Sequence, residues 1–222
     1  MAMLKYAKIQ PQDFGTTDEW RNRLHVIRGD VGAGKSSYLV ALIKELSARL
    51  KKKDGVKALR NAIWVSPQTA QLDKIGKICP GLVFMTPPEF LGWLNESLDD
   101  PEFIEDDASK LIIFDDMARS PLFNSQRDNR LTEFILSRRH HNALIFVTTH
   151  RLLDLPMMLR QYMNFLTSFS GTALENRHVA DFMSRGNHTT DEIIPLLGGL
   201  GAHDSVTFAK ETGNMFRNNI AV

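Results

Sequence analysis

The segment from residue 24 to residue 37 constrains the fold of this chain more than any other. The residues LHVIR at 24–28 have the composition of a short buried strand, and GDVGAGKSS follows at once. From Gly29 to Ser36 this run has the spacing G-x-x-x-x-G-K-[ST], and it leads into a helical pattern. Glycines at these positions allow positive φ, so that successive N–H groups and a helix N-terminus can face one anion. The segment therefore predicts a strand, a phosphate-binding loop and a helix in series.

The loop supplies the predicted nucleotide-binding residues. Lys35 is expected to reach the β- and γ-phosphates, and the Ser36 hydroxyl is expected to ligate Mg²⁺. A glycine-rich turn with a solvated lysine is the alternative, and the flanking strand and helix argue against it. We expect ATP or a similar triphosphate with Mg²⁺ as cofactors. The predicted binding residues are Gly29, Asp30, Val31, Gly32, Ala33, Gly34, Lys35, Ser36 and Ser37.

A second apolar run, LIIFDDM at 111–117, ends in two carboxylates. Because a parallel sheet brings the residues that follow its strands to one edge, these acids are expected near the phosphates. We expect Asp115, at the strand tip, to hold Mg²⁺ through its water shell and Asp116 to polarise the attacking water. Two acids that merely end a strand are the alternative interpretation, which a neighbouring phosphate loop disfavours.

The strand predicted at 143–148 ends in a third polar group, formed by Thr148, Thr149 and His150. If this strand lies between the phosphate-loop strand and the Asp115 strand, these side chains reach the γ-phosphate or the attacking water. A polar residue there can report whether the γ-phosphate is present. Capping of the following helix by Thr149 and His150 is the alternative.

Short apolar runs alternate with helical stretches along the chain, which predicts an α/β fold with a mainly parallel sheet covered on both faces. A glycine-rich stretch and a hairpin at 206–216 follow residue 185. We expect one domain, with a core at 1–185 that includes an N-terminal extension at 1–22, and an appendage at 186–222. The predicted strands are 24–28, 62–66, 82–86, 111–115, 143–148 and 165–169, and the predicted helices are 35–53, 88–98, 127–140, 153–162 and 174–183.

Composition narrows the class of protein. The chain has 222 residues, of which 43 % are hydrophobic, enough for one domain with a real core. Its 27 basic and 26 acidic residues leave a formal charge of +1, so bulk charge indicates neither a nucleic-acid nor a membrane partner. A single cysteine, no apolar run near the ~20 residues of a membrane span, and a start without a secretory h-region lead us to expect a cytosolic setting.

Residues 136–169, LSRRHHNALIFVTTHRLLDLPMMLRQYMNFLTSF, resemble a known family when they are taken together with IIFDDM and the phosphate loop. The resemblance is to the viral genome-packaging ATPases of the poxvirus type, which belong with the FtsK and HerA DNA-pumping ATPases. The blocks are collinear with that family over 24–169. One departure is His150, where relatives usually carry glutamine, so the sensor role is open between His150 and Thr149. The matching blocks are Arg139-His140 before an apolar strand, TTHR at its end, and Leu155-Pro156 and Leu159-Arg160 before the next strand.

The resemblance implies a Mg²⁺-dependent ATPase with a three-layer P-loop NTPase fold of the RecA-like, additional-strand class. It further implies a homo-oligomeric ring, an arginine that completes the neighbour's site, double-stranded DNA and capsid or vertex proteins as partners, and a place in the host cytoplasm or the virion. Arg139 stands about ten residues before the strand end, at ~3.3 Å each, and is therefore expected far from its own phosphates. It is our candidate for an arginine finger, Arg138 is the fallback, and a surface ion pair is the alternative.

Other functions fit parts of the sequence. A phage assembly or secretion ATPase of the Zot-like type has a similar core but usually continues into a transmembrane helix. A small P-loop kinase needs an arginine-bearing lid and has no use for Asp116, and a nucleotide-dependent switch hardly hydrolyses. The hypothesis we carry forward is an ATP-hydrolysing DNA translocase that packages double-stranded viral DNA into a preformed capsid.

Overall fold

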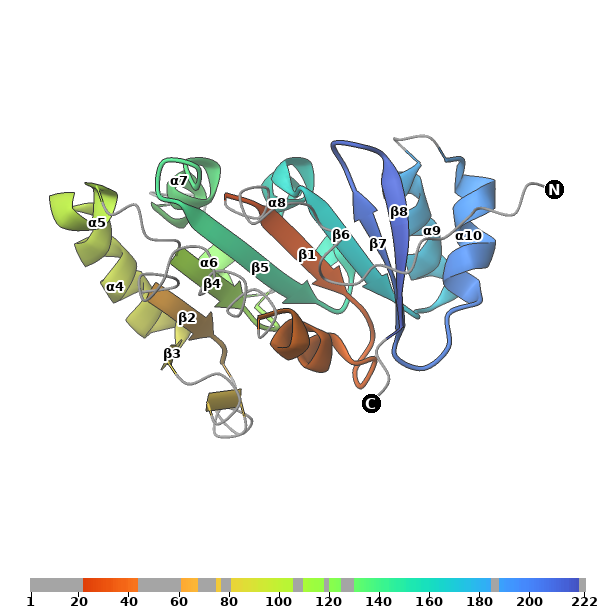
Figure 1. Cartoon of the computed structure of the whole chain (residues 1–222), viewed down its shortest axis with the longest axis horizontal. Coiled ribbons are helices and arrows are strands. Elements are labelled where there is room, and N and C mark those ends of the chain that lie inside the picture. Colours follow the sequence, from red (N-terminus) through yellow and green to blue (C-terminus); the bar gives the residue numbers. More distant parts are fainter. Residues whose placement is uncertain are drawn as a thin grey trace, which may run out of the picture.

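The strands of the protein form one eight-stranded sheet at its centre (Figure 1). The computed structural model describes residues 22–43, 61–67, 75–76, 81–105, 110–117, 120–124, 130–184 and 188–219. The strand order is β3-β2-β4-β5-β1-β6-β7-β8; the first six strands run parallel, and β7 and β8 are added antiparallel. The strands are β1 (Leu24–Arg28), β2 (Asn61–Val65), β3 (Leu82–Met85), β4 (Lys110–Phe114), β5 (Ala143–Thr149), β6 (Phe165–Phe169), β7 (Asp204–Ala209) and β8 (Asn214–Asn219).

Helices cover both faces of this sheet, because side chains alternate between two hydrophobic cores along the central strands. On β4, Ile112 and Phe114 face the first core, and Leu111 and Ile113 face the second. The second core packs the helix that begins at Lys35, described as far as residue 43. The first packs the remaining helices: α4 (Pro87–Leu98), α5 (Pro101–Glu105), α6 (Pro121–Asn124), α7 (Arg130–Leu136), the 3₁₀ turn η3 (Leu152–Asp154), α8 (Met157–Tyr162), α9 (Ala173–Met183) and α10 (Thr190–Gly198).

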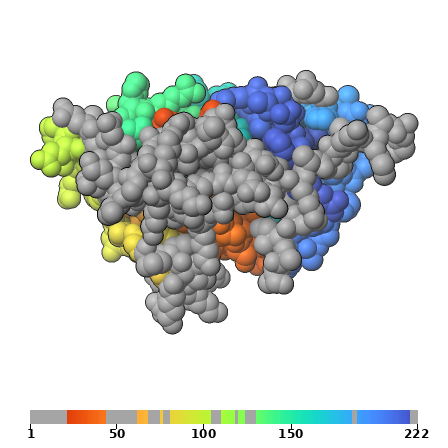
Figure 2. All heavy atoms as spheres, viewed as in Figure 1, coloured from red at the N-terminus to blue at the C-terminus, as the bar shows by residue number. Residues whose placement is uncertain are grey.

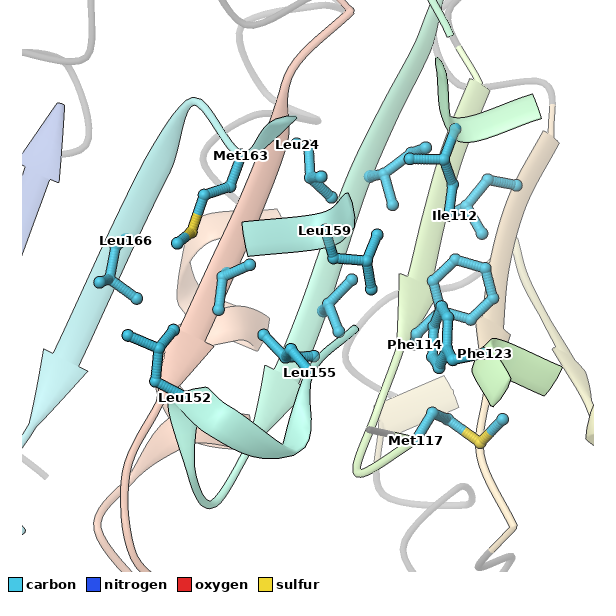
Figure 3. Close-up of a cluster of buried hydrophobic side chains, with 14 of the residues drawn as sticks. Leu24, Ile112, Phe114, Met117, Phe123, Leu152, Leu155, Leu159, Met163 and Leu166 are labelled. Carbon is cyan, nitrogen blue, oxygen red and sulfur yellow. The ribbon is translucent and has the colours of Figure 1, made fainter. Parts of the chain in front are cut away.

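Figure 3 shows the centre of the first core. Leu152 and Leu155 from η3 and its end, together with Leu159 from α8, lie over the strands. Leu24 of β1 and Ile112 of β4 belong to the same core, and all five side chains are at most 1 % exposed. This packing fixes the segment that follows β5, and therefore the position of the residues at the end of β5.

The predicted strands are confirmed, two of them at both ends and the other four to within one residue. The helix expected at 153–162 is divided, because Pro156 has no N–H to continue η3. The helix expected at 127–140 ends at Leu136, and α5, α6 and α10 were not predicted. Residues 1–21 of the predicted extension, and the part of the predicted helix 35–53 beyond residue 43, lie outside the described residues.

The C-terminal hairpin continues the main sheet. Its strands span 204–219, longer than the 206–216 expected, and Ser205 of β7 pairs with Phe169 of β6. The residue before β7 is therefore brought to the edge of the sheet where β1, β4, β5 and β6 end. No helix within the described ranges is long and apolar enough to span a membrane.

A buried polar chain ties the hairpin to β1. The His25 Nε2 atom lies 2.7 Å from the Thr167 hydroxyl, which lies 2.7 Å from the Thr207 hydroxyl. All three side chains are fully buried. Burial lowers the pKa of His25 from 6.5 to about 3, so the ring is neutral in the folded protein near neutral pH.

We expect this histidine to make the fold acid-sensitive. Below pH 6.5 the unfolded chain binds a proton on His25 that the folded protein does not bind until about pH 3, so stability falls as the pH falls. Between pH 6.5 and about pH 5 the loss is about 2 kcal/mol. His25→Phe keeps the ring packing against Phe146 and Phe165 and removes the titration.

Urea unfolding at the two pH values measures the effect. The pH-dependent loss should be smaller in His25→Phe than in the wild-type protein, and unchanged in the control His140→Phe, where the ring is exposed. An equal loss in all three proteins would contradict the prediction.

Candidate active site

The phosphate loop, residues 29–37, leaves β1 at the carboxyl edge of the sheet. Figure 2 shows the orange part of the chain, which includes the helix after this loop, at the surface in the lower part of the view. The Gly29 amide donates to the Thr149 carbonyl at 3.1 Å, which ties the loop to the end of β5. Gly32 and Gly34 have φ of 77° and 102°, the left-handed region that side chains disfavour. A Cβ on Gly29 would lie 2.8 Å from the Cβ of Phe169. Gly29 and Gly34, the two glycines of the G-x-x-x-x-G-K-[ST] pattern, are therefore structurally required.

Lys35 occupies the first turn of the helix and is only 8 % exposed. Its ammonium donates to the carbonyls of Gly29 at 2.7 Å and Asp30 at 3.0 Å. Burial lowers the pKa of Lys35, while the carboxylates of Asp116 and Asp115 act in the opposite direction. The loop thus holds a buried cation beside the acidic pair, the arrangement that anionic phosphates require.

A cavity of about 220 Å³ joins the loop to three strand ends. Ser66, just after β2, and Trp64 within it were not predicted from the sequence, although Ser66 follows its strand at the same edge as Asp115. Val31 is 85 % exposed at the loop tip. The lining residues are Val31, Gly32, Lys35, Ser36, Trp64, Ser66, Ile75, Asp115, Asp116 and His150.

Thr148 holds the acidic pair in place. Its hydroxyl donates to the Asp115 carboxylate at 2.7 Å and accepts from the Asp116 amide at 2.8 Å. Burial raises the pKa of Asp115, and the hydrogen bond from Thr148 acts in the opposite direction. Asp116 has φ of 56°, a left-handed conformation that is rare outside glycine. Its side chain turns to the mouth of the cavity and is 42 % exposed.

β5 lies between β1 and β4, the strand order expected of the additional-strand class. This order carries His150 into the cavity, with Nδ1 3.2 Å from the Lys35 ammonium and Nε2 3.1 Å from the Asp116 carboxylate. In the neutral ring that carries its proton on Nε2, Nδ1 accepts from Lys35 and Nε2 donates to Asp116. Thr149 is buried and donates to the Arg151 carbonyl at 2.8 Å. Of the two sensor candidates, His150 lines the cavity and Thr149 points elsewhere.

The residues predicted to hold Mg²⁺ lie together. Ser36 and Asp115 both line the cavity and supply the hydroxyl and carboxylate oxygens that Mg²⁺ prefers. Among the described residues there is no cluster of three or more His, Cys, Asp or Glu side chains suited to a metal. A magnesium ion needs no such cage, because it keeps several waters and takes its other ligands from substrate phosphates. The donor set therefore fits Mg²⁺ bound together with a nucleotide.

The two arginines before β5 have different environments. Arg138 is 5 % exposed and donates to the carbonyls of Asn22 and Ile135 at 3.0 Å each and to Asn164 Oδ1 at 3.1 Å. These bonds tie Arg138 to its own chain and leave Arg139 as the more accessible candidate for an arginine finger. Arg139 is exposed and pairs with no carboxylate in the described part of the chain. The seven residues of β5, at ~3.3 Å each, separate it from its own phosphate loop.

No protein-family model matches the sequence, and a search of the curated proteins gives no match. Solved structures do match. The DNA-packaging ATPase B204 of Sulfolobus turreted icosahedral virus aligns with a TM-score of 0.65 and 14 % identity, over 91 % of this chain and 98 % of that one. The genome-packaging NTPase B204 of Sulfolobus turreted icosahedral virus 2, in complex with AMPPCP, gives 0.62 and 12 %, over 90 % and 99 %.

A third structure is the cytoplasmic domain of the type VII secretion ATPase EccC of Thermomonospora curvata. Its TM-score is 0.57 and its identity 10 %, over 90 % of this chain and 24 % of that chain. At such identities the likeness is one of fold. Fold and site together define the chain as having the fold of the P-loop ATPases, with a mostly parallel eight-stranded sheet.

Substitutions at Lys35 and Asp116 should have different effects on nucleotide binding and on hydrolysis. Lys35→Ala should lose nucleotide affinity and turnover, because the phosphates lose their buried cation. Asp116→Asn should bind ATP normally and release phosphate about 10² to 10⁴ times more slowly, since its side chain no longer accepts a proton from water. The control is Asp99→Asn, which changes an exposed carboxylate paired with Arg130. Near-normal phosphate release by Asp116→Asn would contradict the role given to this residue.

Proposed function

We propose that this chain is a Mg²⁺-dependent ATPase that drives double-stranded DNA into a preformed viral capsid. The observation that carries the ATPase part is the convergence of Lys35, Asp115, Asp116 and His150 on one cavity beside the phosphate loop. The packaging part is supported by the fold shared with B204 over nearly the whole of both chains. The sequence blocks at 136–169 give independent support, and we keep their poxvirus-type resemblance, with a virion or host-cytoplasm location, as part of the proposal.

The chemistry follows from the positions of the side chains. Loop amides and Lys35 bind the phosphates, and Ser36 and Asp115 would hold Mg²⁺, which when bound neutralises charge on the phosphate oxygens. Asp116, at the mouth of the cavity, accepts the proton of the attacking water, and His150 orients its carboxylate. Because His150 also contacts Lys35, it links the group that binds phosphate to the group that activates water. This link makes His150 the better candidate for the sensor of the γ-phosphate.

The fold alone does not separate packaging from other P-loop functions. The similarity to EccC favours a secretion ATPase as the second candidate, although this chain spans only 24 % of that protein. A kinase uses an acceptor hydroxyl in place of water and has no need of Asp116. The response of phosphate release to DNA and the assembly of subunits into a ring distinguish these functions.

Phosphate release should rise when duplex DNA is added to the protein with Mg²⁺ and ATP. The gain should shrink as salt is raised from about 50 mM to about 200 mM, because a packaging motor contacts mainly DNA phosphates. Asp116→Asn, measured in parallel, should show no such gain and so excludes a contaminating enzyme. Failure of every nucleic acid to stimulate turnover at low salt would favour the secretion, kinase or switch functions.

We also propose a homo-oligomeric ring in which Arg139 acts on the neighbour's nucleotide. Its exposure, the absence of a described ion-pair partner, and its place a strand length from its own phosphate loop support this role. The apolar side chains of Leu136 and Tyr162, 43 % and 49 % exposed, lie on segments close to this end of β5. A surface arginine with apolar neighbours suits a subunit contact.

Mixed rings test the role of Arg139 directly. Arg139→Ala alone should bind ATP and hydrolyse it poorly; such a finger contributes about 10³ to 10⁵ in turnover in well-studied GTPases. Mixing it with the inactive Lys35→Ala creates interfaces that pair an intact phosphate loop with an intact Arg139, so turnover should partly return. Arg177→Ala, on α9, is the matched arginine control. If the two variants co-assemble and turnover stays absent, the trans role is wrong.

A further inference from the structure

The loop between α10 and β7 brings to the phosphate loop a histidine that the mechanism above does not use. The Nδ1 atom of His203 lies 2.9 Å from the position that a Cβ on Gly34 would occupy, and Cγ lies 3.6 Å from it. Gly34 immediately precedes Lys35, so the imidazole packs against the backbone of the motif itself. Any side chain at position 34 would displace this ring.

The backbone conformation and the environment of His203 are both energetically unfavourable. Its φ is 67°, in the left-handed region that residues other than glycine rarely adopt. Its Nδ1 atom is buried and has no hydrogen-bond partner within the described structure. Strained backbone and unpaired buried groups of this kind persist where a function or the surrounding structure requires them. Asp116, on the other side of the phosphate loop, shows the same left-handed strain.

The strand order decides which part of a nucleotide His203 meets. The acidic pair and His150 follow β4 and β5, on one side of β1, whereas β6 and β7 lie on the other side. His203 directly precedes β7, which lies beside β6 (Figure 1). Ser205 of β7 pairs with Phe169 at the end of β6. With its γ end at the acidic pair, a triphosphate bound along the loop would place its ribose and base on the side of β6 and β7.

We propose that His203 contacts the nucleoside part of the bound triphosphate, its ribose or its base. The contact rests on the proposed nucleotide binding and adds a residue that recognises more than phosphates. The ring meets a ribose hydroxyl or a base edge by hydrogen bonding, or the face of a base by stacking. The Gly34 contact fixes the ring, so little side-chain freedom is lost on binding.

Comparing ATP with inorganic tripolyphosphate isolates this contact. We would measure the affinity of both ligands, in Mg²⁺, for the wild-type protein and His203→Gly, in which glycine keeps the left-handed backbone without strain. ATP should bind roughly tenfold more weakly to the variant, and tripolyphosphate with unchanged affinity. The matched control is Asn142→Gly, a left-handed residue (φ 49°) at the opposite end of β5, which should leave both affinities unchanged.

Other outcomes overturn the proposal. An equal loss of affinity for both ligands would make His203 a support of the phosphate loop, and no loss for either would leave it without a role in binding. If the wild-type protein binds neither ligand, the proposed function fails first and the contact fails with it. Should His203→Gly unfold, His203→Asn keeps a residue that tolerates the left-handed conformation and is judged by the same criteria.

Discussion

The parallel register of β1, β5 and β4 is the constraint on which the site depends. Arg28 pairs with Thr149, and Phe114 pairs with Val147, so the residues that follow these strands emerge at the same edge of the sheet. The bond from the Gly29 amide to the Thr149 carbonyl continues the β1–β5 ladder into the phosphate loop. A slip of one residue in β5 would point Thr148 away from the acidic pair and reverse both cores of the sheet.

The site contains buried charges and strained backbone conformations that lower the stability of the folded protein. The packing of the surrounding sheet offsets this loss. Lys35 and Asp115 are charges partly removed from water, and Asp116 and His203 have strained backbones. The five residues of β4 are all buried, as are the seven of β5, and both strands contribute to two separate cores. A strand buried on both faces holds its ends in place, because any displacement would open a cavity on either side.

The strands of this fold could be predicted from the sequence because parallel strands buried on both faces appear as unbroken apolar runs. The phosphate loop and the acidic pair could be predicted because their residues directly follow such runs. Contacts between segments far apart in the sequence could not be predicted. Nothing in the sequence near Thr148 indicates that it bonds both Asp115 and Asp116, and nothing near His203 indicates Gly34. Local signals were also missed: Pro156 predicts the break between η3 and α8, and Thr189 with Glu192 forms the capping box that begins α10.

A glutamine at position 150, the residue usual in the resembling family, would offer the same two kinds of hydrogen-bonding group as the neutral ring of His150. A glutamine offers a carbonyl acceptor and an amide donor, and neutral His150 offers the same pair, Nδ1 to the Lys35 ammonium and Nε2 to the Asp116 carboxylate. The Nδ1 atom also lies 3.3 Å from the Gly29 carbonyl, which is one of the two carbonyls that bind the Lys35 ammonium. The imidazole therefore lies beside both partners of that hydrogen bond, and its other nitrogen faces the Asp116 carboxylate. One side chain at the end of β5 thus connects the phosphate loop to the acidic pair.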